Sequence, residues 1–290
     1  MAGFLARSPS QPQPQPVRLE LSGRRLTDSL ARLVAGCEAR GGIEQYVEAL
    51  GRTGARFRDV LGADGERVGT LEPRQLRGLC AVMPTVRRRI GPWLQRPAFD
   101  ALREDIVRLL DALRDAGTVD ERLGAFGGLF CGGERPRWVR DLGAELLHRL
   151  SAERFPLMSR WVWDAAANTG VLREIWFGGE DGGRIDVPDS YRTFVTLREE
   201  LSGFLTGNGM FRDLVHYVDL LCAQVYAEYI CAQGGSYLRV DFAGEEDPWP
   251  YTARLLGLEG PAGGAREAPP ESIEGGRLDG RSAAARRSSG

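Results

Sequence analysis

Residues 207–235 read GNGMFRDLVHYVDLLCAQVYAEYICAQGG, the most apolar stretch of the chain. If these residues form a helix, apolar side chains cover nearly its whole circumference. A helix at the surface would keep a polar face, so the pattern predicts a helix buried at the centre of the fold. Gly234 and Gly235 are expected to end it.

Helical patterns also dominate the sequence around this stretch. Residues 97–117 give the clearest amphipathic pattern, with Gly117 expected to close the helix and an inward face made of Phe99, Leu102, Ile106, Leu109, Leu110 and Leu113. Residues 26–40, 138–150, 189–205 and 250–258 indicate further helices. Caps are expected at Thr27 or Asp28 for the first of these and at Asp189 or Ser190 for the third.

Two segments favour strands instead. Residues 171–177 and 184–188, separated by a glycine-rich turn, predict a small β-hairpin, and residues 236–242 read as a further strand. The predicted fold class is therefore mainly α, a multi-helix globular domain with a minor β-hairpin element.

Composition predicts where the folded part begins and ends. Residues 1–16 are rich in proline and glutamine, and residues 259–290 are rich in Gly, Ala, Ser and Arg, so both ends are expected to be disordered. One mostly helical domain is expected over 17–258, with a possible internal boundary near 165–188. The length of 290 residues is enough for a sizeable core.

Charge and cysteine usage exclude several classes of protein. The formal net charge is −2, and all 38 basic residues are arginine, so chemistry that needs a lysine amine is excluded. The five cysteines form no C-x-x-C pair, which argues against disulfides and structural zinc. No secretory signal or long apolar run is visible, so we expect a cytoplasmic protein with no membrane partner.

The only two histidines share a pattern. Each follows a carboxylate by three residues, in Glu145-Leu-Leu-His148 and Asp213-Leu-Val-His216, so the members of each pair lie on one face of a helix. This resembles the ligand pattern of ferritin-like di-iron and di-manganese proteins, which implies a site for iron, manganese or zinc. The resemblance implies further ligands from Glu104 or Asp105 and from Glu174, Glu199 or Glu200.

A purely structural role for both histidines stands beside the metal hypothesis. His148 can cap or pack near the end of its helix, where a positive charge is favourable. His216 can be a core histidine that is hydrogen-bonded to Asp213 or Asp219. No cofactor is predicted on this interpretation.

Two short segments combine arginine with tryptophan, as phosphate and base contacts require. The first contains Arg87, Arg88, Arg89 and Trp93, and the second contains Arg137, Trp138 and Arg140. They predict nucleic-acid binding if they share a face, whereas the alternative is that the tryptophans anchor helix packing. Cys131, near Arg135 and Arg137, is the best candidate for an exposed thiol with a lowered pKa.

Residues 146–162, LLHRLSAERFPLMSRWV, resemble a sequence segment of all-α domains related to helix-hairpin-helix DNA glycosylases. In that segment a helix ends, a polar turn follows, and Phe-Pro leads into the next helix. The resemblance lacks the glycine hairpin, and a chain without lysine holds no catalytic lysine. It therefore carries over no catalytic residue, and Trp161 and Trp163 are expected in the core or in an interface.

Three functions follow from these patterns. The leading hypothesis is a regulatory or accessory protein that acts through contacts with another protein, because Trp, Tyr and Arg favour interfaces. A metal-dependent enzyme using Glu145, His148, Asp213 and His216 is the first alternative. Nucleic-acid binding through the Arg/Trp segments is the second.

Overall fold

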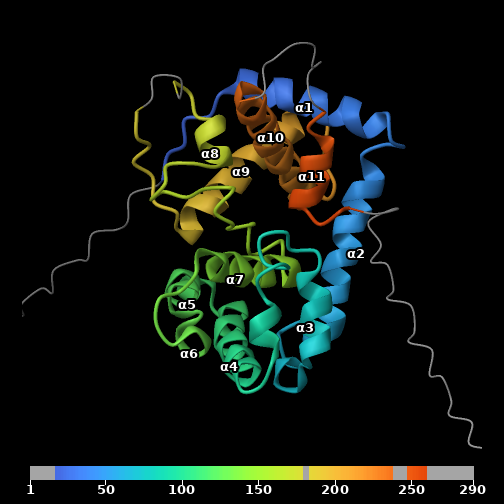
Figure 1. Ribbon diagram of the computed structural model, residues 1–290. Coiled ribbons are helices and arrows are strands. Elements are labelled where there is room, and N and C mark those ends of the chain that lie inside the picture. Colours follow the sequence, from blue (N-terminus) through green and yellow to red (C-terminus); the bar gives the residue numbers. More distant parts are fainter. Residues whose placement is uncertain (1–16, 179–182, 238–246, 260–290) are drawn as a thin grey trace, which may run out of the picture.

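The computed structural model describes residues 17–178, 183–237 and 247–259, and almost all of its regular structure is helical (Figure 1). Strand pairing in these ranges is limited to two isolated bridges, Leu21–Trp176 and Asp164–Thr169. The prediction of a mainly α fold is therefore confirmed.

The α-helices of the described residues are α1 (Gly23–Glu38), α2 (Glu44–Leu61), α3 (Pro73–Cys80), α4 (Ala98–Leu110), α5 (Val119–Ala125), α6 (Gly128–Cys131), α7 (Arg137–Leu150), α8 (Val171–Glu174), α9 (Tyr191–Gly207), α10 (Leu214–Tyr237) and α11 (Trp249–Leu255). The 3₁₀ turns are Val68–Thr70, Gly91–Leu94, Asp111–Leu113 and Ala116–Thr118.

The apolar stretch quoted above forms α10, which packs against α1, α2, α8, α9 and α11. In Figure 1, α10 lies with these neighbours in the upper part of the molecule, while α3 to α7 form the lower part and α2 runs along one side of both. The predicted burial is confirmed for residues 218–225, all of which are buried. The predicted end is wrong, because α10 continues through Gly234 and Gly235 to Tyr237.

Helix α7 is the buried element of the lower part. Every side chain from Asp141 to Leu150 is buried, including those of four ionisable residues. These four are Asp141, Glu145, His148 and Arg149. Charges inside a protein need partners, so α7 sets where the polar contacts of the core lie.

Helix α4 and the 3₁₀ turn that follows it confirm the predicted inward face, because all six apolar residues predicted to form it are buried. The predicted end at Gly117 is wrong. The α-helix ends at Leu110 and passes into a 3₁₀ turn. Gly117 lies in the next turn, where its N–H donates to Asp115 Oδ1 over 2.9 Å. The Asp115 carboxylate therefore starts a new turn at the point where glycine was expected to stop the helix.

The predicted β-hairpin is not formed in the described residues. Val171 to Glu174 form the short helix α8, and the N–H groups of Val171 and Leu172 donate to the carbonyls of Trp161 and Val162 over 3.0 and 3.1 Å. Gly170 permits this with a φ of 119°, since a Cβ there would lie 2.8 Å from the Val162 oxygen. Contacts with an upstream loop thus replace strand pairing.

Helix starts follow the expected chemistry but not always the expected residue. Ser190 caps α9 as predicted, with its hydroxyl accepting from the Thr193 N–H. Helix α1 begins earlier than predicted, since Ser22 accepts from Arg25. Thr27 instead lies inside this helix and donates to the Gly23 carbonyl over 2.9 Å.

The aromatic run after α7 belongs to the core. Trp161 and Trp163 are both buried, and Trp163 Nε1 donates to the Val187 carbonyl over 3.0 Å. Trp161 packs against Tyr226 of α10 with ring centroids 5.8 Å apart. The two tryptophans therefore join the lower part to α10 and to the segment before α9.

Some predictions fall outside the described residues. These are the predicted disorder of residues 1–16, that of the predicted 259–290 tail beyond Glu259, and the part of the predicted strand that follows Tyr237. Within the described ranges, none of the helices combines the length and apolarity needed to cross a bilayer.

Candidate functional site

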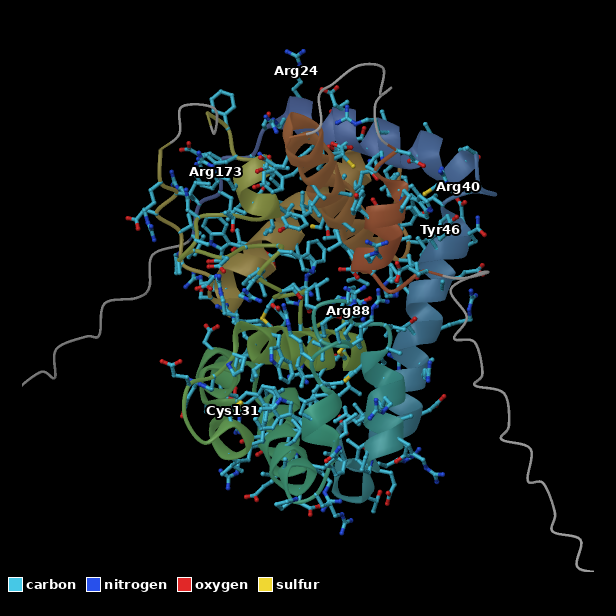
Figure 2. All side chains as sticks on the ribbon, viewed as in Figure 1. Arg24, Arg40, Tyr46, Arg88, Cys131 and Arg173 are labelled. Atoms are coloured by element: carbon cyan, nitrogen blue, oxygen red, sulfur yellow. The ribbon has the colours of Figure 1, made fainter. Side chains whose placement is uncertain are left out.

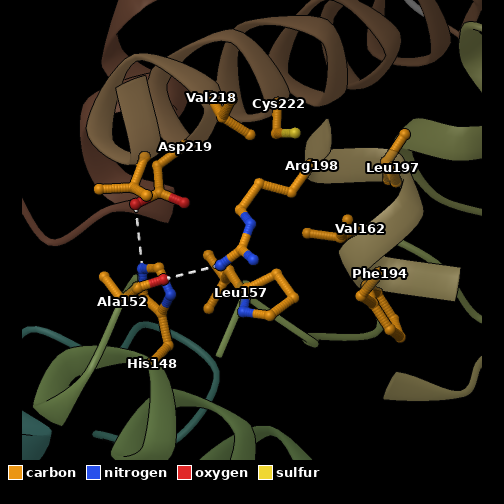
Figure 3. A pocket seen from close by; sticks show the side chains of 12 residues that line it. His148, Ala152, Leu157, Val162, Phe194, Leu197, Arg198, Val218, Asp219 and Cys222 are labelled. Carbon is orange, nitrogen blue, oxygen red and sulfur yellow. Dashed lines mark hydrogen bonds and ion pairs between the residues drawn. The ribbon is translucent and has the colours of Figure 1, made fainter. Parts of the chain in front are cut away.

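The two histidines come together in the fold at Asp219. Figure 3 shows His148 and Asp219 facing each other. His148 is in the last turn of α7, and its Nε2 lies 3.0 Å from Asp219 Oδ2. His216 is in the first turn of α10, and its Nδ1 lies 3.8 Å from the same oxygen. That Nδ1 is buried and makes no hydrogen bond. Asp219 follows His216 by three residues, so both project from one face of α10.

The turn after α7 fixes the His148 ring. The N–H groups of Arg154 and Phe155 donate to the Ser151 carbonyl over 3.1 and 2.9 Å, which folds the chain back toward the helix end. His148 Nδ1 then lies 2.9 Å from the Phe155 carbonyl oxygen. A carbonyl accepts but cannot donate, so Nδ1 carries a proton. The carboxylate at Nε2 is also an acceptor, so the geometry favours the doubly protonated imidazolium.

The electrostatics agree with this assignment. Burial lowers the pKa of His148, but the charge of Asp219 and its hydrogen bond outweigh burial and leave that pKa raised. Burial raises the pKa of Asp219, but the charge and hydrogen bond of His148, with a smaller contribution from His216, leave it well below its usual value. The two residues therefore form a buried ion pair between α7 and α10.

A small cavity lies beside this pair (Figure 3). Its volume is about 20 Å³, which is room for one water molecule. Arg198 lines it from α9 and donates to the carbonyls of Ala152 and Glu153 over 3.1 and 2.7 Å. Cys222 also lines it, and burial raises the pKa of its thiol. The cavity is too small for an organic substrate.

The two carboxylates predicted to ligate metal do not join the histidines. Glu145 accepts a hydrogen bond from Arg149 Nε over 3.1 Å within α7, and Asp213 is exposed ahead of α10. The further candidates are also placed elsewhere. Glu104 pairs with Arg108, Asp105 accepts from the Leu129 and Phe130 N–H groups, Glu174 pairs with Arg25, and Glu199 and Glu200 are exposed.

In the described ranges, no group of three or more His, Cys, Asp or Glu residues is arranged to hold a metal ion. The metal hypothesis implied that the two histidines lie together, and in the fold both lie close to Asp219. It placed the wrong carboxylates beside them, although Asp219 was one of the two partners considered for His216. The signal for Asp219 was its position three residues after His216 on the central helix.

The two Arg/Trp segments meet, but through packed rings. Trp93 and Trp138 both pack against Phe130, with ring centroids 5.2 and 6.5 Å from it. Trp138 is buried, so its faces are not open to a nucleic-acid base. Arg87 pairs with Glu259 over 2.7 Å and Arg137 with Asp164 over 2.6 Å.

The remaining basic residues of these segments are placed as follows. Arg140 pairs with Asp189, Arg89 donates to the Thr85 carbonyl over 3.2 Å, and Arg88 is exposed near the middle of the molecule (Figure 2). Cys131 does not fit the predicted reactive thiol. Partial burial and the charge of Asp105 raise its pKa more than Arg135 lowers it.

A groove of about 410 Å³ opens between the start of α2 and α11. Its floor is aromatic: Tyr46 and Trp249 lie with ring centroids 4.3 Å apart. The Arg40 guanidinium lies 5.7 Å from the Trp249 ring centroid, and Arg40 and Tyr46 lie on the same side of the molecule (Figure 2). The residues that line this α2/α11 groove are Arg40, Gln45, Tyr46, Trp249, Pro250, Ala253, Arg254, Leu258 and Glu259.

The groove was not predicted, since Tyr46 and Trp249 are far apart in the sequence. The sequence does place an acidic run, Glu245, Glu246 and Asp247, before Pro248, and such a run is typical of a helix N-terminus. The N-cap of α11 is Pro248, and Asp247 just before it accepts from the Trp249 N–H over 3.1 Å, while Glu245 and Glu246 lie outside the described residues.

Comparison with known proteins adds no relative to this picture. No family model matches the chain, and neither curated proteins nor solved structures gave a match.

Proposed function

We propose that the chain acts by binding another protein, and that the α2/α11 groove is the binding site. The observation that carries this proposal is the pairing of an aromatic floor with arginines at the rim. Tryptophan, tyrosine and arginine contribute most of the binding energy in protein interfaces. The volume of about 410 Å³ is in the range of ligand-binding pockets.

The floor is also held firmly enough to serve as a docking surface. Trp249 is 8% exposed and fixed between Tyr46 and Arg40. Helix α11, which carries Trp249, is held at its end by α7, because Arg149 donates to the Leu256 carbonyl over 3.2 Å. A preorganised surface loses little conformational entropy when a partner binds.

Replacing Tyr46 by alanine tests the proposal. A matched control is Tyr229→Ala, because Tyr229 is also half-buried and also packs against one other ring, that of Tyr226, but lies outside the groove. A partner that the natural chain retains is purified and titrated against all three proteins. We expect Tyr46→Ala to weaken binding about tenfold or more, as removal of a hot-spot side chain does. Equal affinities for the two variants would reject the groove as the site.

Metal-dependent activity is the second candidate function, and one observation favours it. Both imidazoles point at Asp219, and His148 Nδ1 is bonded to a carbonyl, as the outer nitrogen of a metal-bound histidine usually is. A metal would have to replace the proton between His148 and Asp219. Elemental analysis for iron, manganese and zinc decides this, with His148→Ala and His216→Ala alongside. Metal near one equivalent that both variants lose would support the candidate, whereas its absence from the natural chain would end it.

A further inference from the structure

We infer that the segment bound in the α2/α11 groove is acidic, and that Glu259 of the free chain occupies the place that a carboxylate of the partner takes. This inference rests on the proposed function of the groove. Glu259 Oε2 accepts from Arg87 Nη1 over 2.7 Å, and its Oε1 accepts from Arg254 Nε over 2.9 Å. Two guanidinium groups from distant parts of the chain thus converge on one carboxylate at the rim.

The local structure presents Glu259 at this place. Helix α11 ends with the Leu258 N–H donating to the Ala253 carbonyl over 2.8 Å and the Gly257 N–H donating to the Arg254 carbonyl over 3.1 Å. This is the hydrogen-bond pattern of a Schellman motif, and Gly257 supplies its left-handed residue with a φ of 70°. Leu258 is buried by the turn, so the next residue, Glu259, is directed to the rim.

The charges around the groove fit a carboxylate-bearing partner. Arg40, at the other end, is also held by a carboxylate of the chain, that of Asp247. Among the charged residues that line the groove, two are arginines, Arg40 and Arg254, and one is acidic, Glu259. If Glu259 moves aside, Arg87 and Arg254 are both left to pair with a new anion.

Displacing Glu259 costs little, because ion pairs at the surface contribute little net stability. The Glu259 side chain is 36% exposed and that of Arg254 is 52% exposed. A partner that brings apolar side chains onto Tyr46 and Trp249 gains contacts that Glu259 does not make. The partner's carboxylate then recovers the arginine hydrogen bonds that Glu259 gives up.

The test uses the full chain and three fluorescein-labelled peptides in fluorescence anisotropy. The first peptide alternates glutamate with proline and leucine, and the other two carry glutamine or lysine at the glutamate positions. The protein variants are Glu259→Gln, Arg254→Gln and the control Arg108→Gln. Arg108 is similarly exposed and also pairs with a glutamate, Glu104, but lies on α4.

Substitutions of Glu259 and of Arg254 should change the affinity for the glutamate peptide in opposite directions. Removing the resident carboxylate with Glu259→Gln should tighten binding of the glutamate peptide about two- to fivefold, since its two exposed ion pairs, with Arg87 and Arg254, no longer compete. Arg254→Gln should weaken it, and Arg108→Gln should leave it unchanged. The glutamine peptide should bind more weakly and respond little to any variant. Thermal unfolding of each variant checks that the fold is retained.

Three results would overturn the inference. The first is equal binding of the glutamate and glutamine peptides, and the second is preference for the lysine peptide, which would indicate a basic partner. The third is tighter binding of the glutamate peptide when Glu267, Glu271 and Glu274 of the same chain are changed to glutamine, because the chain's own acidic residues would then be the occupant. The Tyr46→Ala test does not depend on charge, so it can succeed where this inference fails.

Discussion

Replacing Asp219 by asparagine removes the charge that keeps His148 protonated in the core, and the loss of stability should depend on pH in a definite direction. In the natural chain the pKa of His148 is raised by Asp219. The contribution of the pair is therefore fully present below the unfolded histidine value of about 6.5 and is lost as pH rises through the higher folded pKa. The lowered pKa of Asp219 keeps its carboxylate ionised at pH 5.

In Asp219→Asn the net shift in the pKa of His148 changes sign. Burial then dominates and the pKa of His148 falls, so the ring is neutral in the fold, with Nδ1 still bonded to the Phe155 carbonyl and Nε2 able to accept from the asparagine amide. At pH 5, folding must remove a proton from His148 or bury its charge without a partner. Losing one member of a buried pair costs about 3–5 kcal/mol. At pH 9 the ring is neutral in both states of the variant, and the loss should fall to about 1 kcal/mol, the scale of one hydrogen bond.

Urea unfolding of both chains at pH 5 and pH 9 measures this difference. The control is Asp213→Asn, an exposed carboxylate just ahead of the same helix whose φ of 51° an asparagine tolerates. The control should change the free energy of unfolding by less than about 0.5 kcal/mol at either pH. A loss in Asp219→Asn that is equal at the two pH values, or larger at pH 9, would refute the assignment of a charged His148.

Two further substitutions test the turn after α11 and a buried hydrogen bond of the core. Gly257→Ala should destabilise the chain by about 1–3 kcal/mol in thermal unfolding, because the φ of 70° is strained for alanine and its Cβ would lie 2.3 Å from the Val82 oxygen. Gly133→Ala, where a Cβ meets nothing within 4 Å, should be close to neutral. Trp163→Phe should cost about 1–3 kcal/mol by leaving the buried Val187 carbonyl without its donor.

Local periodicity was enough to predict most helices but not where they stop. The inward face of α4 and the burial of α10 follow from side-chain spacing, which is a property of the helix itself. The ends depend on other contacts: Asp115, within the predicted helix, caps a new turn before Gly117, and the carbonyls of Trp161 and Val162 take up the N–H groups expected to pair in a hairpin. The second contact has no signal in residues 171–177, because its acceptors lie in another segment.

The candidate sites show the same limit. Spacing placed His148 and His216 on helix faces, and the fold brings them together. Which carboxylate joins them depends on how α7 and α10 are rotated, and on α7 the side chains are buried all round, so burial selects no face. The groove could not be predicted from local sequence, because Tyr46 and Trp249 become neighbours only when α2 and α11 pack.

The buried charges of α7 connect the core to the groove. Glu145 and Arg149 form a buried pair, and Arg149 also donates to the Leu256 carbonyl at the end of α11. Buried pairs contribute little net stability compared with apolar packing, but removing one partner costs about 3–5 kcal/mol. Glu145→Gln leaves the Arg149 charge without its carboxylate, so Arg149 should move and release Leu256.

Hydrogen–deuterium exchange resolves this effect by segment. We expect Glu145→Gln to speed amide exchange in α11 more than in α4, because α11 loses the bond that anchors its last turn. The same release should loosen the turn that presents Glu259 and weaken peptide binding in the groove. Equal acceleration in α4 and α11 would mean that Glu145 supports the fold as a whole, and that α7 does not position the groove. Faster exchange confined to α11 would mean that the Glu145–Arg149 pair of α7 maintains the shape of the groove.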